Sequence, residues 1–143
     1  MKEITIFIMF LLVTIFFFYK IASDKNGNDE YFENLNLKMV AVITDEPDCT
    51  NGYNGFCVLD LHVLQSNIKY YDLRNKADYY YGIIKNDKAE IYQEGVRGFC
   101  KKGDTIFIDS KDKTFHYKGG WAPMILYHNA FFYDYIAKYH QKL

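Results

Sequence analysis

An apolar stretch near the amino terminus constrains this chain more than any other feature. Residues Ile4–Phe18, ITIFIMFLLVTIFFF, contain no charged residue and only two threonines. The stretch is 15 residues long, whereas a membrane-spanning helix needs about 17–25 and a signal-peptide core has about 7–15. Extension to Ala22 reaches a spanning length, because Tyr19 can lie among lipid headgroups and Lys20 can extend its ammonium group to water.

Cleavage as a secretory signal requires small residues before the cut. A cut after Ser23 leaves Ile21 where a small residue is needed, and a cut after Ala22 leaves Lys20 there. We therefore expect residues 1–22 to be an uncleaved single-pass anchor, with the membrane contacted by residues 4–22. The alternatives are secretion after signal cleavage and a buried core helix.

The sequence gives little information about the orientation of this anchor in the membrane. Lys2 precedes the apolar stretch, and Lys20 and Lys25 follow it, so the positive-inside rule gives little preference. A short amino-terminal tail usually stays in the cytoplasm. The expectation is an inner (cytoplasmic) membrane protein whose body is extracytoplasmic, in the periplasm.

The body of the chain predicts a mainly β (α+β) domain. Aromatic residues make up 19% of the sequence, which is typical of half-buried strands and atypical of disorder. Five or six short strands separated by turn signals favour a small antiparallel OB- or SH3-like barrel or a sandwich over βαβ units. The expected strand regions are 38–44, 56–64, 78–93 (two strands joined at Asn86-Asp87), 104–109 and 113–118.

These strands define the expected domain organisation. Residues 23–37 are predicted to be a polar linker, and residues 38–118 the β-domain. Residues 119–143 are predicted to be a Gly-Gly hinge and an aromatic helix that begins near Pro123, a residue suited to a first helical turn. That helix would pack on the barrel, on a partner or on the membrane.

The segment Lys101–Lys118, KKGDTIFIDSKDKTFHYK, resembles the carboxyl-terminal hairpin of small bacterial proteins of unknown function. These proteins combine an amino-terminal anchor with a compact β-domain and enter a strand through Gly-Asp-Ser/Thr-Ile. The similarity covers the anchor, the first strand and this hairpin. The resemblance implies no activity and no functional residue.

Two of the three cysteines bracket a turn-rich loop, Cys49-Thr-Asn-Gly-Tyr-Asn-Gly-Phe-Cys57. The spacing fits neither a zinc finger nor a Cys-x-x-Cys redox motif. In an oxidising compartment a Cys49–Cys57 disulfide is the expected pairing. The alternatives are that Cys100 pairs with one of them or that all three are buried and reduced.

No catalytic motif is recognisable in the sequence, so we expect no enzymatic activity and no cofactor. The single set of residues worth testing as metal ligands or as an acid–base group is Asp60, His62 and His116. Asp60 and His62 alternate onto one face of a strand. His116 would point opposite to Phe115 and Tyr117 of its own strand.

Tyrosine and tryptophan are enriched at protein interfaces. The sequence therefore predicts a non-enzymatic, membrane-tethered domain that contacts another protein. The alternatives are a small enzyme or metal-binding domain, and an OB-like binder of nucleic acid or peptide. A net charge of −1 argues against a nucleic-acid partner. The expected interaction surface comprises Tyr79, Tyr80, Tyr81, Trp121, Phe131 and Tyr135.

Overall fold

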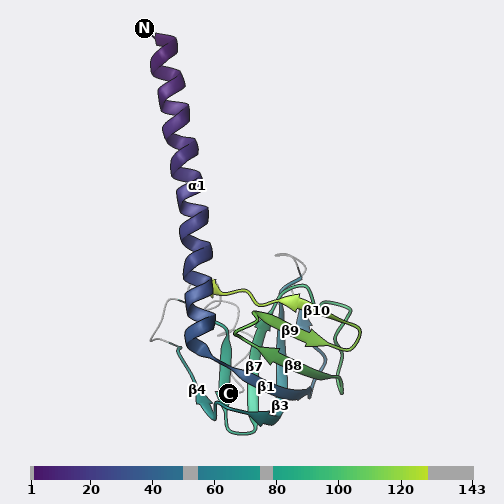
Figure 1. The fold of residues 1–143 in the computed structure, drawn as a ribbon. Helices are drawn as coiled ribbons and strands as arrows, with labels where there is room; N and C mark the ends of the chain where they lie inside the picture. The colour runs from purple at the N-terminus through teal and green to yellow at the C-terminus, as the bar shows by residue number, and fades with distance from the viewer. Residues whose placement is uncertain (1, 50–54, 75–78, 129–143) are drawn as a thin grey trace.

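A computed structural model describes residues 2–49, 55–74 and 79–128 (Figure 1). A long helix is followed by short strands. The elements are α1 Lys2–Leu35, β1 Lys38–Ile43, β2 Asp48–Cys49, β3 Cys57–Ser66, β4 Tyr70–Tyr71, β5 Tyr79–Tyr80, β6 Gly82–Lys85, β7 Lys88–Gln93, β8 Thr105–Asp109, β9 Thr114–Tyr117, β10 Gly120–Pro123 and β11 Tyr127–His128.

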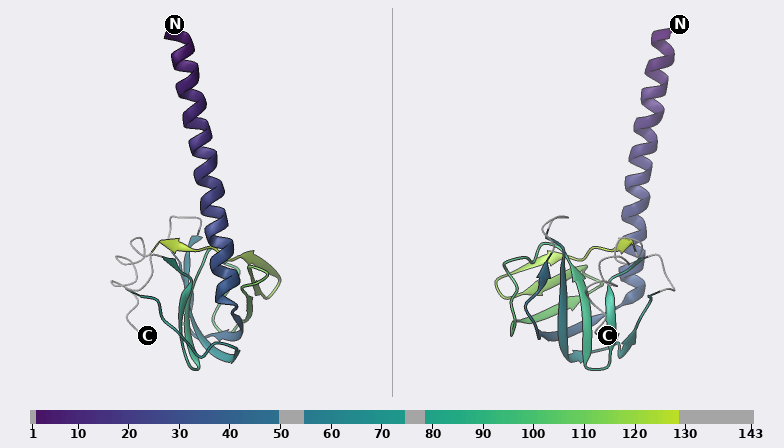
Figure 2. Two further views of the ribbon diagram at one scale, coloured as in Figure 1. Left: turned by 60° about the vertical axis from the view of Figure 1, so that its left-hand side comes forward. Right: turned by 180° about the vertical axis from the view of Figure 1, so that it is seen from behind.

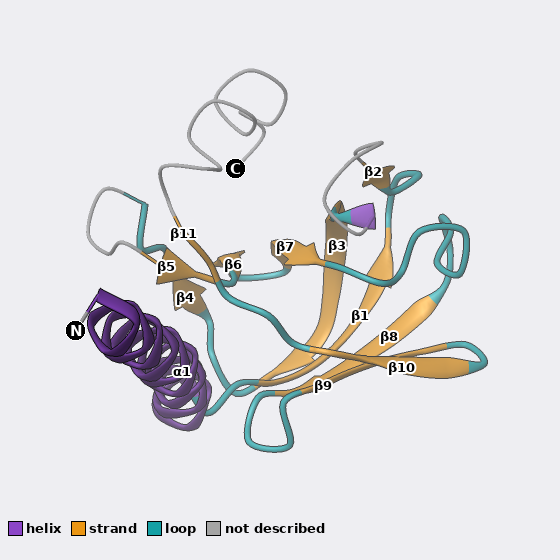
Figure 3. Cartoon of the chain, turned by 90° about the horizontal axis from the view of Figure 1, so that it is seen from above, coloured by secondary structure: helices purple, strands orange, loops and turns teal. Residues whose placement is uncertain are grey.

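Nine of these strands form one strongly curved antiparallel sheet in the order β10-β9-β8-β1-β3-β7-β6-β4, with β2 paired to β3, and β5 and β11 form a separate two-stranded sheet. Viewed from above, this sheet is an open half-barrel (Figure 3). The mainly β class is confirmed, and the predicted runs correspond to β1, β3, β6, β7, β8 and β9. The described residues contain more strands than predicted, because β2, β4, β5, β10 and β11 have only two to four residues and show no clear alternation.

Alternation along the strands builds the core on the inner face of the half-barrel. Met39, Ala41 and Ile43 of β1 are buried there. They are joined in the same core cluster by Leu59, Leu61, Ile84, Ala89, Ile91, Ile106, Ile108, Phe115 and Ala122. Between β6 and β7, Asn86 and Asp87 form the predicted tight turn, where Asn86 has a φ of 59°. Asparagine tolerates this left-handed conformation better than most residues.

The carboxyl-terminal end of α1 is part of the core. Phe32 is buried in the core cluster, and its ring contacts the rings of Tyr31 and Tyr81 edge-on at 5.4 and 5.6 Å. On the same part of the helix, Asp29 forms an ion pair of 2.8 Å with Lys113. The end of α1 thus contacts the segments that precede both β6 and β9.

Within the predicted linker 23–37, α1 continues to Leu35, and residues 36–37 join it to β1. Packing of Phe32 in the core and the Asp29 ion pair outweigh the local turn signal of Asn26-Gly27. The helix ends at Leu35, and the next residue, Asn36, has a φ of 46°, the left-handed conformation common just after helices.

Away from this base, α1 projects beyond the β-domain (Figure 2). The large apolar side chains from Ile6 to Tyr19 are 49–73% exposed. Within the part of the chain that the structure describes, no helix combines the length and the apolarity that a membrane crossing requires.

The carboxyl-terminal region also differs from its prediction. Gly120–Pro123 form strand β10, paired with β9, where a hinge and a helix start were expected. Tyr127–His128 form β11, paired with β5. The β-structure therefore extends past the predicted boundary at residue 118. The remainder of the predicted helix lies outside the described residues.

Two hydrogen bonds of Ser110 hold the segment that connects α1 to the sheet. Its buried hydroxyl accepts a 2.7 Å hydrogen bond from the Leu37 amide, and its own amide donates to the Leu37 carbonyl at 2.9 Å. We expect Ser110→Ala to lower the free energy of unfolding by about 2 kcal/mol, because the buried Leu37 amide loses its partner. Urea unfolding measures this loss.

The matched control is Ser66→Ala. The Ser66 hydroxyl also accepts an amide hydrogen bond, from Ile68 at 3.1 Å, but this site is partly exposed. Water can replace the lost group there, so a cost of about 0.5 kcal/mol is expected. Equal losses in the two variants would contradict the special role of Ser110.

Candidate functional site

The predicted disulfide is present. Cys49 of β2 lies directly opposite Cys57 of β3, and their sulfur atoms are bonded at 2.04 Å. Cys100 is the free cysteine and lies in the core, where burial and the nearby Asp104 carboxylate raise the pKa of its thiol to about 11. The alternative pairing through Cys100 is therefore wrong.

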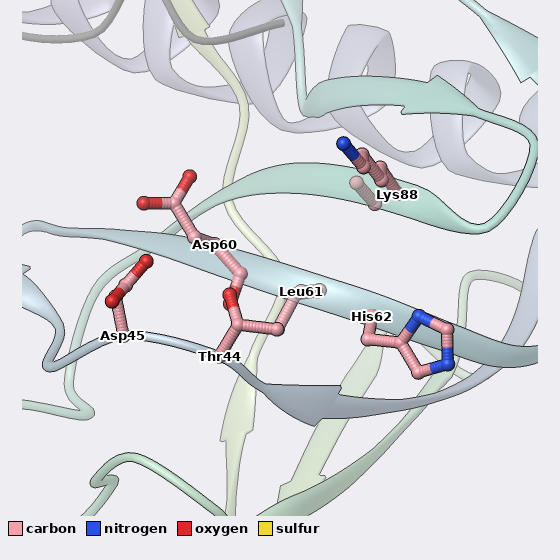
Figure 4. Close-up of a pocket in the computed structure, with 7 residues that line it drawn as sticks. Thr44, Asp45, Asp60, Leu61, His62 and Lys88 are labelled. Atoms are coloured by element: carbon pink, nitrogen blue, oxygen red, sulfur yellow. The ribbon is translucent and has the colours of Figure 1, made fainter.

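Asp60 and His62 line a shallow hollow of about 310 Å³ on the outer face of the sheet (Figure 4). Asp60 lies opposite Glu90 of β7, and His62 lies opposite Lys88. The Asp60 backbone carbonyl accepts hydrogen bonds from the amide and the hydroxyl of Thr44, at 2.9 and 3.1 Å. Figure 4 shows the Asp60 carboxylate and the His62 ring pointing in different directions.

His116 does not join this pair. It lies on β9, which β8 and β1 separate from β3. At a strand spacing of about 4.8 Å, β9 lies roughly 14 Å from β3 across the sheet. In register, His116 is aligned with Gln65 rather than with His62, which adds a further offset along the strands. Among the described residues, no three His, Cys, Asp or Glu side chains are grouped so that they could hold a metal ion.

The residues proposed as an interaction surface separate into three groups. Tyr81 is a core residue, so its assignment to the surface was wrong. Trp121 is 63% exposed. The backbones of Tyr79 and Tyr80 form β5, while their side chains, together with Phe131 and Tyr135, lie outside the part of the structure that is described.

Tyr81 belongs to a buried polar network. Its hydroxyl donates a 2.7 Å hydrogen bond to the Gln93 side chain, whose amide group donates to the carbonyls of Glu94 and Pro123. Burial raises the pKa of Tyr81 well above its usual value. Gln93 thereby ties β7 to the end of β10, which identifies Tyr81 as a structural residue.

Trp121 is one end of a row of side chains that crosses the outer face of the sheet. In register, Trp121 of β10 lies opposite His116 of β9, and His116 lies opposite Phe107 of β8. Phe107 in turn lies opposite Val40 of β1, and Val40 lies opposite Gln65 of β3. Residues opposite one another on paired strands share a face. We call this set (Trp121, His116, Phe107, Val40 and Gln65) the outer-face row.

The outer-face row is exposed and adjoins a second hollow. Phe107 is 39% exposed, and its ring centroid lies 5.9 Å from that of His116. The hollow, of about 350 Å³, is lined in part by Phe107, Val40 and Gln65. It lies where the pairing of β1 with β3 shifts register between Val40 and Ala41. Such bulges redirect side chains and are enriched beside functional sites.

Sequence reasoning identified Trp121 and His116 but assigned them to different sites. For Phe107, the sequence predicts only a position in a strand. The available signal was the alternation in TIFID and TFHY, which places Phe107 and His116 on the faces opposite to Ile106, Ile108 and Phe115.

Comparison with protein-family models, with curated proteins and with solved structures gives no match for this chain. The fold and the surface therefore define a curved antiparallel β-domain with a disulfide and a long amino-terminal helix. The resemblance of Lys101–Lys118 to anchored bacterial β-domain proteins stays a prediction.

Proposed function

We propose that this chain is a membrane-tethered, non-enzymatic β-domain that binds another molecule on the extracytoplasmic side. The observation that carries the proposal is the exposure of the apolar side chains from Ile6 to Tyr19 around α1. A helix that is apolar on all sides is normally buried, either in a large protein core or in a membrane. Each large side chain that leaves water contributes about 1.5–3 kcal/mol.

The length of the apolar segment is compatible with a tether. The uncharged residues 4–18 extend about 22 Å at 1.5 Å per residue, whereas residues 4–22 extend about 28 Å, close to the thickness of a bilayer core. Within the apolar segment, the Thr14 hydroxyl donates to the Phe10 carbonyl at 2.8 Å. A polar group satisfied within the helix can enter hydrocarbon at lower cost.

The Cys49–Cys57 disulfide supports placement of the β-domain outside the cytoplasm. Disulfides persist in oxidising compartments, such as the periplasm, and are rare where cellular reductants act. Together with a short amino-terminal tail, this favours an inner-membrane anchor whose amino terminus stays in the cytoplasm. Secretion after cleavage is the alternative, and it would separate the β-domain from the apolar part of α1.

The binding role rests on the exposed surface. Of the two described side chains in the surface predicted from sequence, Trp121 is exposed, and tryptophan is a frequent anchor of binding interfaces. We also propose that the β-domain is of the OB- or SH3-like fold type, and the strongly curved antiparallel sheet supports this assignment. Binding of another protein was the sequence-based expectation.

The test combines membrane extraction with topology. We expect the full chain to stay in the membrane pellet after an alkaline carbonate wash. The double variant Leu11→Lys, Ile15→Lys should shift to the supernatant, because each central lysine costs about 2.5–3.5 kcal/mol in a bilayer. The matched control Glu33→Lys, Asn34→Lys adds lysines at exposed polar positions of the same helix and should stay in the pellet.

A reporter fused after Leu143 that is active only outside the cytoplasm tests the orientation. Activity of that fusion is expected. Release of the unmodified chain by carbonate would overturn the tether, and an inactive reporter with an intact fusion would overturn the extracytoplasmic placement.

A further inference from the structure

We propose that the outer-face row binds an uncharged oligosaccharide, with a sugar ring stacked on Trp121. The inference rests on the proposed function, because it names the ligand class for that binding domain. Trp121, His116 and Phe107 lie side by side on three neighbouring strands. At about 4.8 Å per strand, these three positions span about 10 Å, which suits a few linked sugar rings.

The chemistry of the row matches a sugar. A pyranose ring presents C–H groups on its faces and hydroxyl groups around its edge. The C–H groups are attracted to the electron-rich face of an aromatic ring. Hydroxyls need donors and acceptors nearby, and the flanking positions supply them. Thr114, Asp109 and Lys38 lie in register on one side of the row, Thr105 lies on the other, and Gln65 lies at its end.

The hollow beside Phe107 adds a place for a substituent. Its lining combines the apolar surfaces of Met39, Val40 and Phe107 with the side chains of Lys38, Gln65, Ser66 and Asn67. The Ser66 hydroxyl and the Asn67 amide also hydrogen-bond to backbone groups of the protein. An acetamido group has the same combination of a methyl and an amide. The hollow therefore favours a sugar chain that carries N-acetyl groups.

Charge argues against an anionic polymer at this surface. The cation next to the row, Lys38, forms an ion pair of 2.7 Å with Asp109. That contact lowers the pKa of the Asp109 carboxyl, chiefly through the hydrogen bond from Lys38, so the pair is neutral at physiological pH. Nucleic-acid binding depends on unneutralised basic groups, whereas a neutral sugar does not.

Backbone pairing argues against an extended peptide across the row. β9, β8 and β1 are each paired on both sides, so their amides and carbonyls are engaged in the sheet. A peptide lying across them would bury its own backbone groups without strand partners, which is costly. A sugar has no such backbone, and its hydroxyls can stay at the solvated edge.

The single tryptophan of the chain makes the proposal directly measurable. Full-length protein in lipid nanodiscs, free of sugar-based detergent, is titrated with a neutral oligomer of N-acetylglucosamine. We expect a saturable change in tryptophan emission. Phe107→Ala should weaken binding at least about tenfold, equivalent to 1.4 kcal/mol, and Trp121→Ala should weaken it similarly by calorimetry.

Phe99→Ala is the matched control. Phe99 is 64% exposed, and its ring lies near Tyr117, which packs against the core from the other face of β9. This variant should bind like the unmodified protein. The proposal would be overturned if the oligomer caused no emission change, or if Phe99→Ala weakened binding as much as Phe107→Ala. It would also be overturned if an anionic oligomer bound more tightly, or if the emission change came from self-association without sugar.

This titration is independent of the carbonate wash and of the reporter. If the chain is membrane-bound but the oligomer has no effect, only the oligosaccharide proposal fails. If the oligomer binds but carbonate releases the chain, only the tether fails.

Discussion

Phe32→Ala is expected to lower the free energy of unfolding by about 3–5 kcal/mol, the range for removing a buried phenylalanine. The Phe32 side chain is 1% exposed and contacts both Tyr31 and Tyr81. Its loss leaves a cavity where the end of α1 enters the core cluster, between Tyr31 and Leu35, which also pack against that cluster. Urea unfolding followed by near-ultraviolet circular dichroism measures the effect, because the aromatic rings around Phe32 report their packing.

Glu33→Ala provides the control for Phe32→Ala. Glu33 is the next residue on α1 and is exposed, so its removal should change the free energy of unfolding by less than about 0.5 kcal/mol. If Phe32→Ala is as stable as Glu33→Ala, the end of α1 does not contribute to the core.

The second large effect is expected on removal of the disulfide. Cys49→Ser, Cys57→Ser should lower the free energy of unfolding by about 2.5 kcal/mol, the entropic value for a loop this short. The two cysteines are 8 positions apart, and the bond joins β2 to the first residue of β3. Chemical unfolding with and without reductant measures the difference.

Reductant should destabilise the unmodified protein and leave the double variant unchanged. Cys100→Ala should keep the full response to reductant, because Cys100 is not part of the bond. Alkylation of the unfolded, unreduced chain should label one cysteine. Labelling of three cysteines in freshly isolated protein would contradict an oxidised pair.

The long strands could be predicted because the alternation of apolar and polar residues along a strand follows the alternation of buried and exposed side chains. In β1, for example, Met39, Ala41 and Ile43 are buried, whereas Lys38, the first residue of the strand, is exposed. The Asn86-Asp87 turn could be predicted for a similarly local reason, since asparagine accepts a left-handed backbone.

The helical continuation of α1 could not be predicted from local signals. Asn26-Gly27 indicates a turn, and the contacts that favour helix there involve partners far along the chain, Tyr81 and Lys113. The same applies to β10. Gly119-Gly120 and Pro123 indicate a hinge and a helix start, whereas pairing with β9 makes this segment a strand.

The outer-face row depends on register across five strands. Alternation alone predicts that Phe107 and His116 lie on outward faces, but it does not determine which residues stand opposite each other. The short turns that join β8 to β9 and β9 to β10 set that register. The sequence alone therefore predicts a group of His116 with Asp60 and His62, whereas in the sheet His116 lies opposite Phe107 and Trp121.

The unbroken course of α1 has a geometric consequence. The helix runs without interruption from its apolar part to Phe32 in the core, so the β-domain is held at a fixed angle around the helix axis. Each residue inserted into the intervening turns would rotate the β-domain by about 100° and move it about 1.5 Å along that axis. The number of residues between the apolar part and Phe32 thus determines the direction in which Trp121 faces.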